Sequence, residues 1–289
     1  MGLLGHKLRT GILFAAAVVA LLALAGSANA SARYTGVWTT QALGGFRVGP
    51  NQPLDGLWQG SWDCKLTGCA RGGARAVRSG KCLRGRCARL AIRDDHNHLP
   101  DSVGFHLWRS SGRDGYGEAY EGQGTRSHWR WTFRFGKGFP TWASEWQFVN
   151  ITEWHSTGFN APGHPLVINA QLGQIHATSY GWDGRENRGR SAWSCKLADS
   201  YRRGVWYKIR VDAHWSVSAD ARLRVRLGYA GRPGWTKTCI RDDGYGNLFM
   251  DPNGRPDEIY MAQNLYRSAV YKRDMVVYYD KTRQVGRRR

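Results

Sequence analysis

The sequence predicts an all-β protein built as a two-sheet β-sandwich. Residues 128–135 (HWRWTFRF) alternate so that every second side chain is aromatic. Such period-two alternation is typical of a strand with one face in a core. Helical periodicity is scarce, and glycine-rich breaks at 112–124, 181–189 and 228–234 separate the alternating runs as loops. Many strands without helices bury their apolar faces by packing two sheets together.

The first thirty residues predict a secretory signal peptide. A basic start leads into an apolar run over 12–25, and Ala28-Asn29-Ala30 then supplies small residues for cleavage. The apolar run is shorter than the roughly 20 residues that a membrane-spanning helix needs. We therefore expect a secreted, extracellular protein in which residues 31–289 form a single domain, with no membrane span.

The cysteines agree with export, because an even number in an oxidising compartment predicts disulfides. All six lie beyond residue 30: Cys64, Cys69, Cys82, Cys87, Cys195 and Cys239. We expect three disulfides, one of them between Cys195 and Cys239. The other four cysteines close two local loops or cross-link two segments; a zinc site is the alternative, although their spacing is wide for a zinc knuckle. Residues 31–99, turn-rich and cysteine-bearing, are expected to elaborate the same domain, and a separate small module is the alternative.

The chain is strongly basic, with 42 Lys and Arg against 22 Asp and Glu, a formal net charge of +20. Such a field attracts polyanions, of which acidic polysaccharide, nucleic acid and anionic cell envelope are the candidates. Segment 71–93 is rich in arginine, and a solvated face is the alternative interpretation. No nucleic-acid-binding motif is present, so we expect no specific nucleic-acid partner. We expect a monomer.

Other runs alternate in the same way: 166–171, 205–215 and 222–227. Side chains two apart in a strand share a face, so Glu153 and His155 should point away from Trp154 and Phe148. Tyr260 and Tyr266 should share a face as well. By the same parity, further polar side chains could reach one open surface with these groups and donate hydrogen bonds there: Arg130, Arg134, Asn169 and Gln171.

The order of these motifs resembles the heparin lyase-like and alginate lyase-like polysaccharide lyases. The resemblance covers about Gly115 to Val285 and depends on 129–135, 153–155, 204–207, 214–216, 260–266 and 277–280. It implies a concanavalin A-like β-jelly roll that binds an acidic polysaccharide on a concave sheet. It places His155 and Tyr266 on the catalytic histidine and tyrosine, with Tyr260 at the substrate. Glu153, Ala262 and Asn264 stand where that family has Gln, Lys and Gly.

The implied reaction is β-elimination at a uronate, in which a base takes a proton, an acid protonates the leaving oxygen, and hydrogen-bond donors neutralise the carboxylate. We expect His155, Tyr266 and Glu153 to be catalytic, and no metal or organic cofactor, because the scheme demands none. A non-catalytic carbohydrate- or envelope-binding protein on the same scaffold is one alternative. A glycoside hydrolase is another, although Glu145 and Glu153 on one strand would lie roughly 26 Å apart, beyond the ~10 Å that hydrolysis allows.

Overall fold

The computed structural model describes residues 33–38, 73–83, 85–92, 102–106, 108–109, 117–118, 121–141, 148–156, 163–182, 190–251, 253–267 and 274–287. Every regular element in these ranges is a β-strand. No helix long and apolar enough to cross a membrane occurs among them. The predicted signal peptide, together with Cys64, Cys69 and Glu145, lies outside the described residues.

The larger sheet contains eight strands in the order β14-β13-β12-β7-β16-β3-β2, with β1 also paired to β16. All its pairs are antiparallel. The strands are β1 (Arg33–Trp38), β2 (Gly73–Arg78), β3 (Arg86–Ile92), β7 (Arg126–Phe135), β12 (Trp206–His214), β13 (Arg222–Tyr229), β14 (Lys237–Arg241) and β16 (Met275–Arg287).

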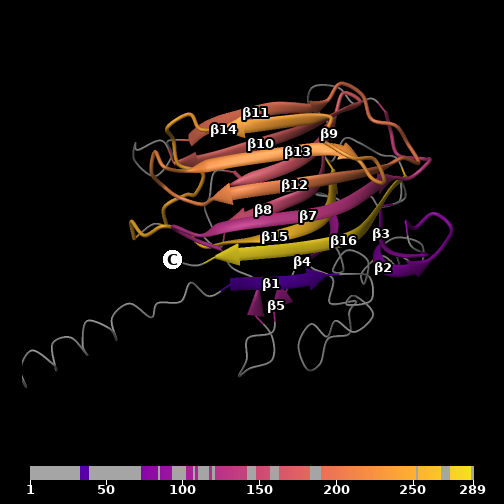
Figure 1. Cartoon of the computed structure of the whole chain (residues 1–289), viewed down its shortest axis with the longest axis horizontal. Helices are drawn as coiled ribbons and strands as arrows, with labels where there is room; N and C mark the ends of the chain where they lie inside the picture. The colour runs from indigo at the N-terminus through magenta and orange to yellow at the C-terminus, as the bar shows by residue number, and fades with distance from the viewer. Residues whose placement is uncertain are drawn as a thin grey trace, which may run out of the picture.

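The smaller sheet contains six antiparallel strands in the order β11-β10-β9-β8-β15-β4. They are β4 (Ser102–His106), β8 (Val149–Ser156), β9 (Leu166–Gln171), β10 (Gln174–Trp182), β11 (Arg190–Ala198) and β15 (Ile259–Arg267). A separate pair joins β5 (Trp108–Arg109) to β6 (Gly117–Glu118). In Figure 1 the strands of the two large sheets interleave because one sheet lies behind the other, so the predicted two-sheet sandwich is confirmed.

Tryptophans fill the centre of the core between the sheets. Trp129 and Trp131 of β7 lie 6.1 and 6.0 Å, ring centre to ring centre, from Trp154 of β8, and all three are buried. The buried carboxylate of Glu121 accepts hydrogen bonds from the indole N–H groups of Trp129 and Trp154. These tryptophans are therefore structural, and truncating one to Ala should cost about 3–5 kcal/mol of stability.

The predicted alternation holds in β12 and β13. Tyr207, Ile209, Val211 and Ala213 are buried along β12, and the residues between them are more exposed. In β13 the buried Leu223, Val225 and Leu227 alternate with arginines. One face of the larger sheet thus packs on the core, and the opposite face carries charge.

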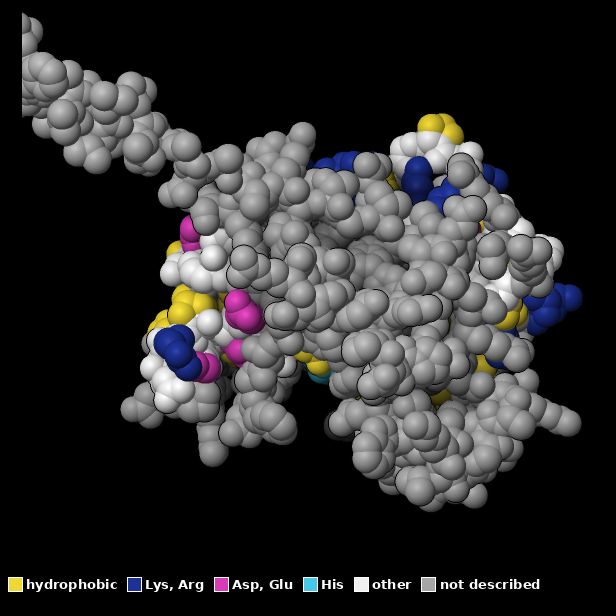
Figure 2. Space-filling model, turned by 90° about the horizontal axis from the view of Figure 1, so that it is seen from below, with side chains coloured by type: hydrophobic (Ala, Val, Ile, Leu, Met, Phe, Trp, Pro, Cys, Tyr) yellow, Lys and Arg dark blue, Asp and Glu magenta, His cyan; other side chains and the backbone are white. Residues whose placement is uncertain are grey.

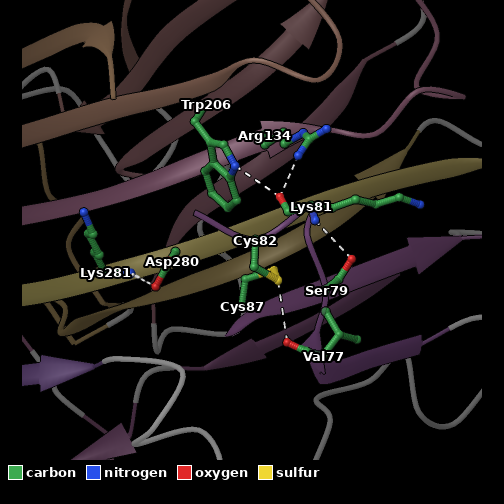
Figure 3. Close-up of a disulfide and its surroundings, with 9 residues drawn as sticks. All are labelled: Val77, Ser79, Lys81, Cys82, Cys87, Arg134, Trp206, Asp280 and Lys281. Carbon is green, nitrogen blue, oxygen red and sulfur yellow. Dashed lines mark hydrogen bonds between the residues drawn. A yellow bond between two sulfur atoms is a disulfide. The ribbon is translucent and has the colours of Figure 1, made fainter. Parts of the chain in front are cut away.

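Two disulfides are formed among the described cysteines. Cys195 of β11 bonds Cys239 of β14, which confirms that predicted pair and ties an edge strand of each sheet together. Cys82 bonds Cys87 and closes a local loop between β2 and β3. Figure 3 shows this loop against the larger sheet, where the Lys81 carbonyl accepts hydrogen bonds from Arg134 at 2.6 Å and from the Trp206 indole at 3.2 Å.

Candidate active site

The candidate site lies on the outer face of the smaller sheet, where β8, β9 and β15 are neighbours. The register pairs His155 with Tyr260, Glu153 with Ala262, and Asn150 with Tyr266. The intervening residues of β15, Ile259, Met261 and Leu265, belong to the core. The predicted shared face for Glu153, His155, Tyr260 and Tyr266 is therefore what the structure shows.

A bulge in β8 changes which residues reach this face. The pairing of β8 with β9 shifts between Asn150 and Thr152. An extra residue at such a point reverses the alternation of the chain before it. Phe148, expected to point with Trp154 into the core, instead lies with its ring centre 5.3 Å from that of Tyr266. The bulge also brings Asn150 to the side of Glu153.

Glu153 is the centre of a polar cluster beneath this face. Its side chain is only 1% exposed, and one carboxylate oxygen lies 2.9 Å from Nε2 of His155. The other lies 3.8 Å from Nε2 of His164, which precedes β9. The amides of Asn150 and Asn264 each donate a hydrogen bond to the carboxylate. A buried carboxylate is retained in a fold when it is paired and hydrogen-bonded in this manner.

These partners fix the charge of Glu153. Burial alone would raise the pKa of its carboxyl, but His155, His164 and Asn150 outweigh burial and lower the pKa from 4.5 to about 2. Glu153 is therefore a carboxylate at neutral pH. A protonated acid that mimics the family's neutral amide does not fit this environment.

The imidazole of His155 is held on three sides. It contacts the Glu153 carboxylate, stacks on the Tyr260 ring at 5.4 Å and 18°, and meets the His164 ring edge-to-face at 4.7 Å. A carboxylate against Nε2 favours the tautomer with the proton on that nitrogen, which makes Nδ1 the proton-accepting atom. Burial lowers the pKa of His164, with Glu153 opposing and His155 assisting, so His164 is neutral at pH 7.

Tyr266 stands at the other end of the cluster. Burial first, and the charge of Glu153 second, raise the pKa of its phenol. The hydroxyl therefore stays protonated at neutral pH and can donate a proton. A raised pKa suits a general acid better than a general base at that pH.

The remaining predicted donors divide between two surfaces. Asn169 pairs with Asn150 across β9 and β8, and Asn169 and Gln171 alternate with core residues, so both share the outer face of the smaller sheet. Arg130 and Arg134 do not. They belong to β7, and their outward side is the opposite surface of the sandwich. The prediction that these two arginines share the site was wrong, because alternation within a strand does not reveal to which sheet the strand belongs.

Within the part of the chain that the structure describes, one group of side chains is suited to a metal ion. Glu153, His155 and His164 offer ligand atoms that all lie within 4.8 Å of one another. Two imidazoles and a carboxylate are a zinc-type donor set. An ion bound there would engage both Glu153 and His155, so it would compete with the contact between them that is described above.

Three members of the cluster were missed from the sequence. Asn150 reaches Glu153 only because of the bulge, and His164 precedes its strand, where no alternation applies. Asn264 stood out as a departure from the family's glycine, and its amide now proves to serve Glu153. Two departures from the family pattern, Glu153 and Asn264, are therefore linked, because the Asn264 amide donates a hydrogen bond to the Glu153 carboxylate.

No family model matches the sequence, and no curated protein matches it by sequence comparison. Solved structures do. The endo-β-1,4-glucuronan lyase of the fungus Trichoderma reesei superimposes with a TM-score of 0.54 at 12% identity, over 74% of this chain and 87% of that one. Alginate lyases from Aplysia kurodai and Pseudomonas aeruginosa give TM-scores of 0.47 and 0.42 at 11% and 16% identity, over 72% of this chain and 86% and 84% of theirs. The fungal structure shows that this chain has the fold of a polysaccharide lyase.

Proposed function

We propose that this chain is a secreted polysaccharide lyase that cleaves a uronate-containing acidic polysaccharide by β-elimination. The observation that carries the proposal is the Glu153–His155 pair on an outer sheet face together with the protonated Tyr266. A base, an acid and a buried carboxylate that orients the base are the groups for two proton transfers.

In the first transfer, Nδ1 of His155 takes the proton from the sugar carbon next to the uronate carboxylate. The electron pair forms the new C=C bond, and the bond to the 4-linked oxygen breaks. The imidazole becomes positively charged, and Glu153, at 2.9 Å, stabilises that charge. Glu153 is thus a positioning residue beneath the surface.

In the second transfer, the leaving oxygen receives a proton from the Tyr266 hydroxyl. Its raised pKa keeps that proton available at neutral pH. The uronate carboxylate gathers charge as the reaction proceeds, and the amides of Asn169 and Gln171 are the donors proposed to stabilise it. Tyr260, stacked on His155, lines the same surface. No step of this scheme requires a metal or an organic cofactor.

Two further observations support the assignment. The disulfides Cys82–Cys87 and Cys195–Cys239 are typical of a protein that works outside the cell. The shared fold with a glucuronan lyase makes a uronate polymer the natural substrate class to examine first.

The test is incubation of the secreted chain with a panel of uronate polymers, polyglucuronate and alginate among them, while ultraviolet absorbance reports the unsaturated product. We expect absorbance to rise with at least one polymer. Binding without absorbance would favour the carbohydrate-binding alternative. Cleavage to saturated ends would favour a hydrolase.

A further inference from the structure

The outer face of the larger sheet carries a row of arginines in direct register. Arg226 of β13 pairs with Arg210 of β12, and Arg210 pairs with Arg130 of β7. Neighbouring strands lie about 4.8 Å apart, so the row presents one arginine per strand at a regular interval. Like charges directly opposite one another destabilise a sheet, and among the described side chains this sheet places them opposite one another twice in succession.

Further cations share this face. Arg222 pairs with His214, and His214 with Arg126, to form a second row, while Arg224 lies between the two rows. Lys208 and Arg134 extend the face along β12 and β7. We call this surface, defined by the described side chains of Arg126, Arg130, Arg134, Lys208, Arg210, Arg222, Arg224 and Arg226, the arginine face.

Two described acidic side chains contact the arginine face: Asp212 lies at its centre, and Asp242 lies 3.6 Å from Arg222. The Asp212 carboxylate is shared by Arg210, whose Nε lies 2.7 Å away, by Arg226, and by His128 at 2.5 Å. Arg126, Arg130 and Arg224 are exposed. Viewed from below, the Lys and Arg side chains that are coloured stand mainly along the top and right margins, and one more lies at the left beside the coloured Asp and Glu side chains (Figure 2).

We propose that the arginine face binds a linear acidic polysaccharide, as a surface distinct from the site on the smaller sheet. A periodic row of cations fits a polymer with a charged group on each unit better than a single small anion. Guanidinium groups recognise carboxylates through paired hydrogen bonds. The arginine face and the candidate active site lie on opposite outer faces of the sandwich, so a chain bound at one leaves the other open.

The choice of polysaccharide rests on the proposed function, because a lyase gains from being held on its own polymer. The aromatic side chains of this face also favour a polysaccharide over a single-stranded nucleic acid. Single-stranded nucleic acids bind on open aromatic rings. On the arginine face the Trp235 ring is covered by Lys208 at 4.9 Å and Arg226 at 5.5 Å, and the Trp206 indole donates to the Lys81 carbonyl (Figure 3).

The test compares two triple variants, both in a His155→Ala background so that the polymer stays intact. One removes exposed arginines of the face: Arg126→Ser, Arg130→Ser and Arg224→Ser. The control removes three exposed cations from the segments between strands, one of which, Arg255, is paired with Asp251: Lys137→Ser, Arg203→Ser and Arg255→Ser. Both lose the same net charge. Affinity for polyglucuronate is measured at several salt concentrations, with neutral dextran and duplex DNA as further probes.

We expect the first triple variant to bind polyglucuronate at least about tenfold more weakly and with a flatter salt dependence. The control should stay within about twofold of the parent. Arg130→Glu alone should weaken binding in the same direction, and it guards against misfolding of the triple variant. Equal loss in both triple variants would overturn the proposal, and so would tighter binding of duplex DNA than of polyglucuronate. The result is independent of turnover: if the chain cleaves no polymer, the proposed function fails while this binding surface stands.

Discussion

Replacing Glu153 by Gln is the most informative single change, because it preserves volume and removes only the buried charge. In the chain as it stands, the carboxylate accepts from both Asn150 and Asn264 and contacts His155 at 2.9 Å. A Gln amide cannot accept from all of these donors, and its own N–H groups would face one of them. It would also favour the wrong tautomer of His155.

The structure sets the size of the effect on stability. Lowering the pKa of Glu153 from 4.5 to about 2 corresponds to roughly 3 kcal/mol of folding free energy. Because the folded-state pKa is the lower one, this stability is present above pH 4.5 and is lost as the pH falls toward 2. About 2 kcal/mol of it should be gone by pH 3. Urea unfolding of wild type and Glu153→Gln should therefore differ most near pH 7 and converge in acid.

The same variant should lose elimination activity by a factor on the order of 10² to 10⁴, the cost of an imidazole in the wrong tautomer. The matched control is Glu258→Gln, which changes an exposed carboxylate just before β15. It should alter neither the free energy of unfolding nor the elimination rate. Turnover equal to or above wild type in Glu153→Gln would refute this reasoning. It would mean that residue 153 acts as the neutral amide of the family motif.

Three further outcomes are expected. His155→Ala and Tyr266→Phe should each lower the elimination rate by about 10² or more, with folding retained. Tyr260→Phe, which keeps the ring stacked on His155, should lower the rate far less. Wild-type rates in the first two variants would mean that other residues carry out the proton transfers. Thiol titration of the denatured secreted chain should find no free thiol, and four free thiols with bound zinc would revive the metal interpretation of the cysteine cluster. Added Zn²⁺ should inhibit elimination by binding to His155 and His164, and a chelator added to the metal-free protein should leave the elimination rate unchanged. Full inhibition by Zn²⁺ in His164→Ala would count against zinc binding at these side chains.

Alternation along single strands predicted much of this molecule. The buried aromatics of β7, the apolar side of β12 and the common face of Glu153 and His155 all follow from period two. Strand pairing across the sequence does not follow from it. Arg130 and Arg134 alternate as predicted, yet their strand lies in the other sheet. The alternation that places Arg130 and Arg134 on one side of β7 therefore puts them on the arginine face and not at the candidate active site.

Local departures from regular structure account for the rest. The β8 bulge moves Phe148 and Asn150 to the outer face, and nothing in the residue pattern marks it. His164 enters the cluster from the segment before β9, where side-chain direction has no fixed period. In the sequence, Asn264 stands out only as a mismatch to the family motif. Its role becomes clear only in the structure, where its amide donates to the Glu153 carboxylate.

The central claim is that this chain breaks a uronate polymer by elimination, and the mass of the products tests it most directly. Products of wild type acting on a uronate polymer that it cleaves should be analysed by mass spectrometry beside those of Tyr266→Phe. Elimination predicts new ends that are one water lighter than hydrolysis would give, formed quickly by wild type and slowly by the variant. Fully hydrated ends, or unsaturated ends formed at the same rate by both proteins, would contradict the account.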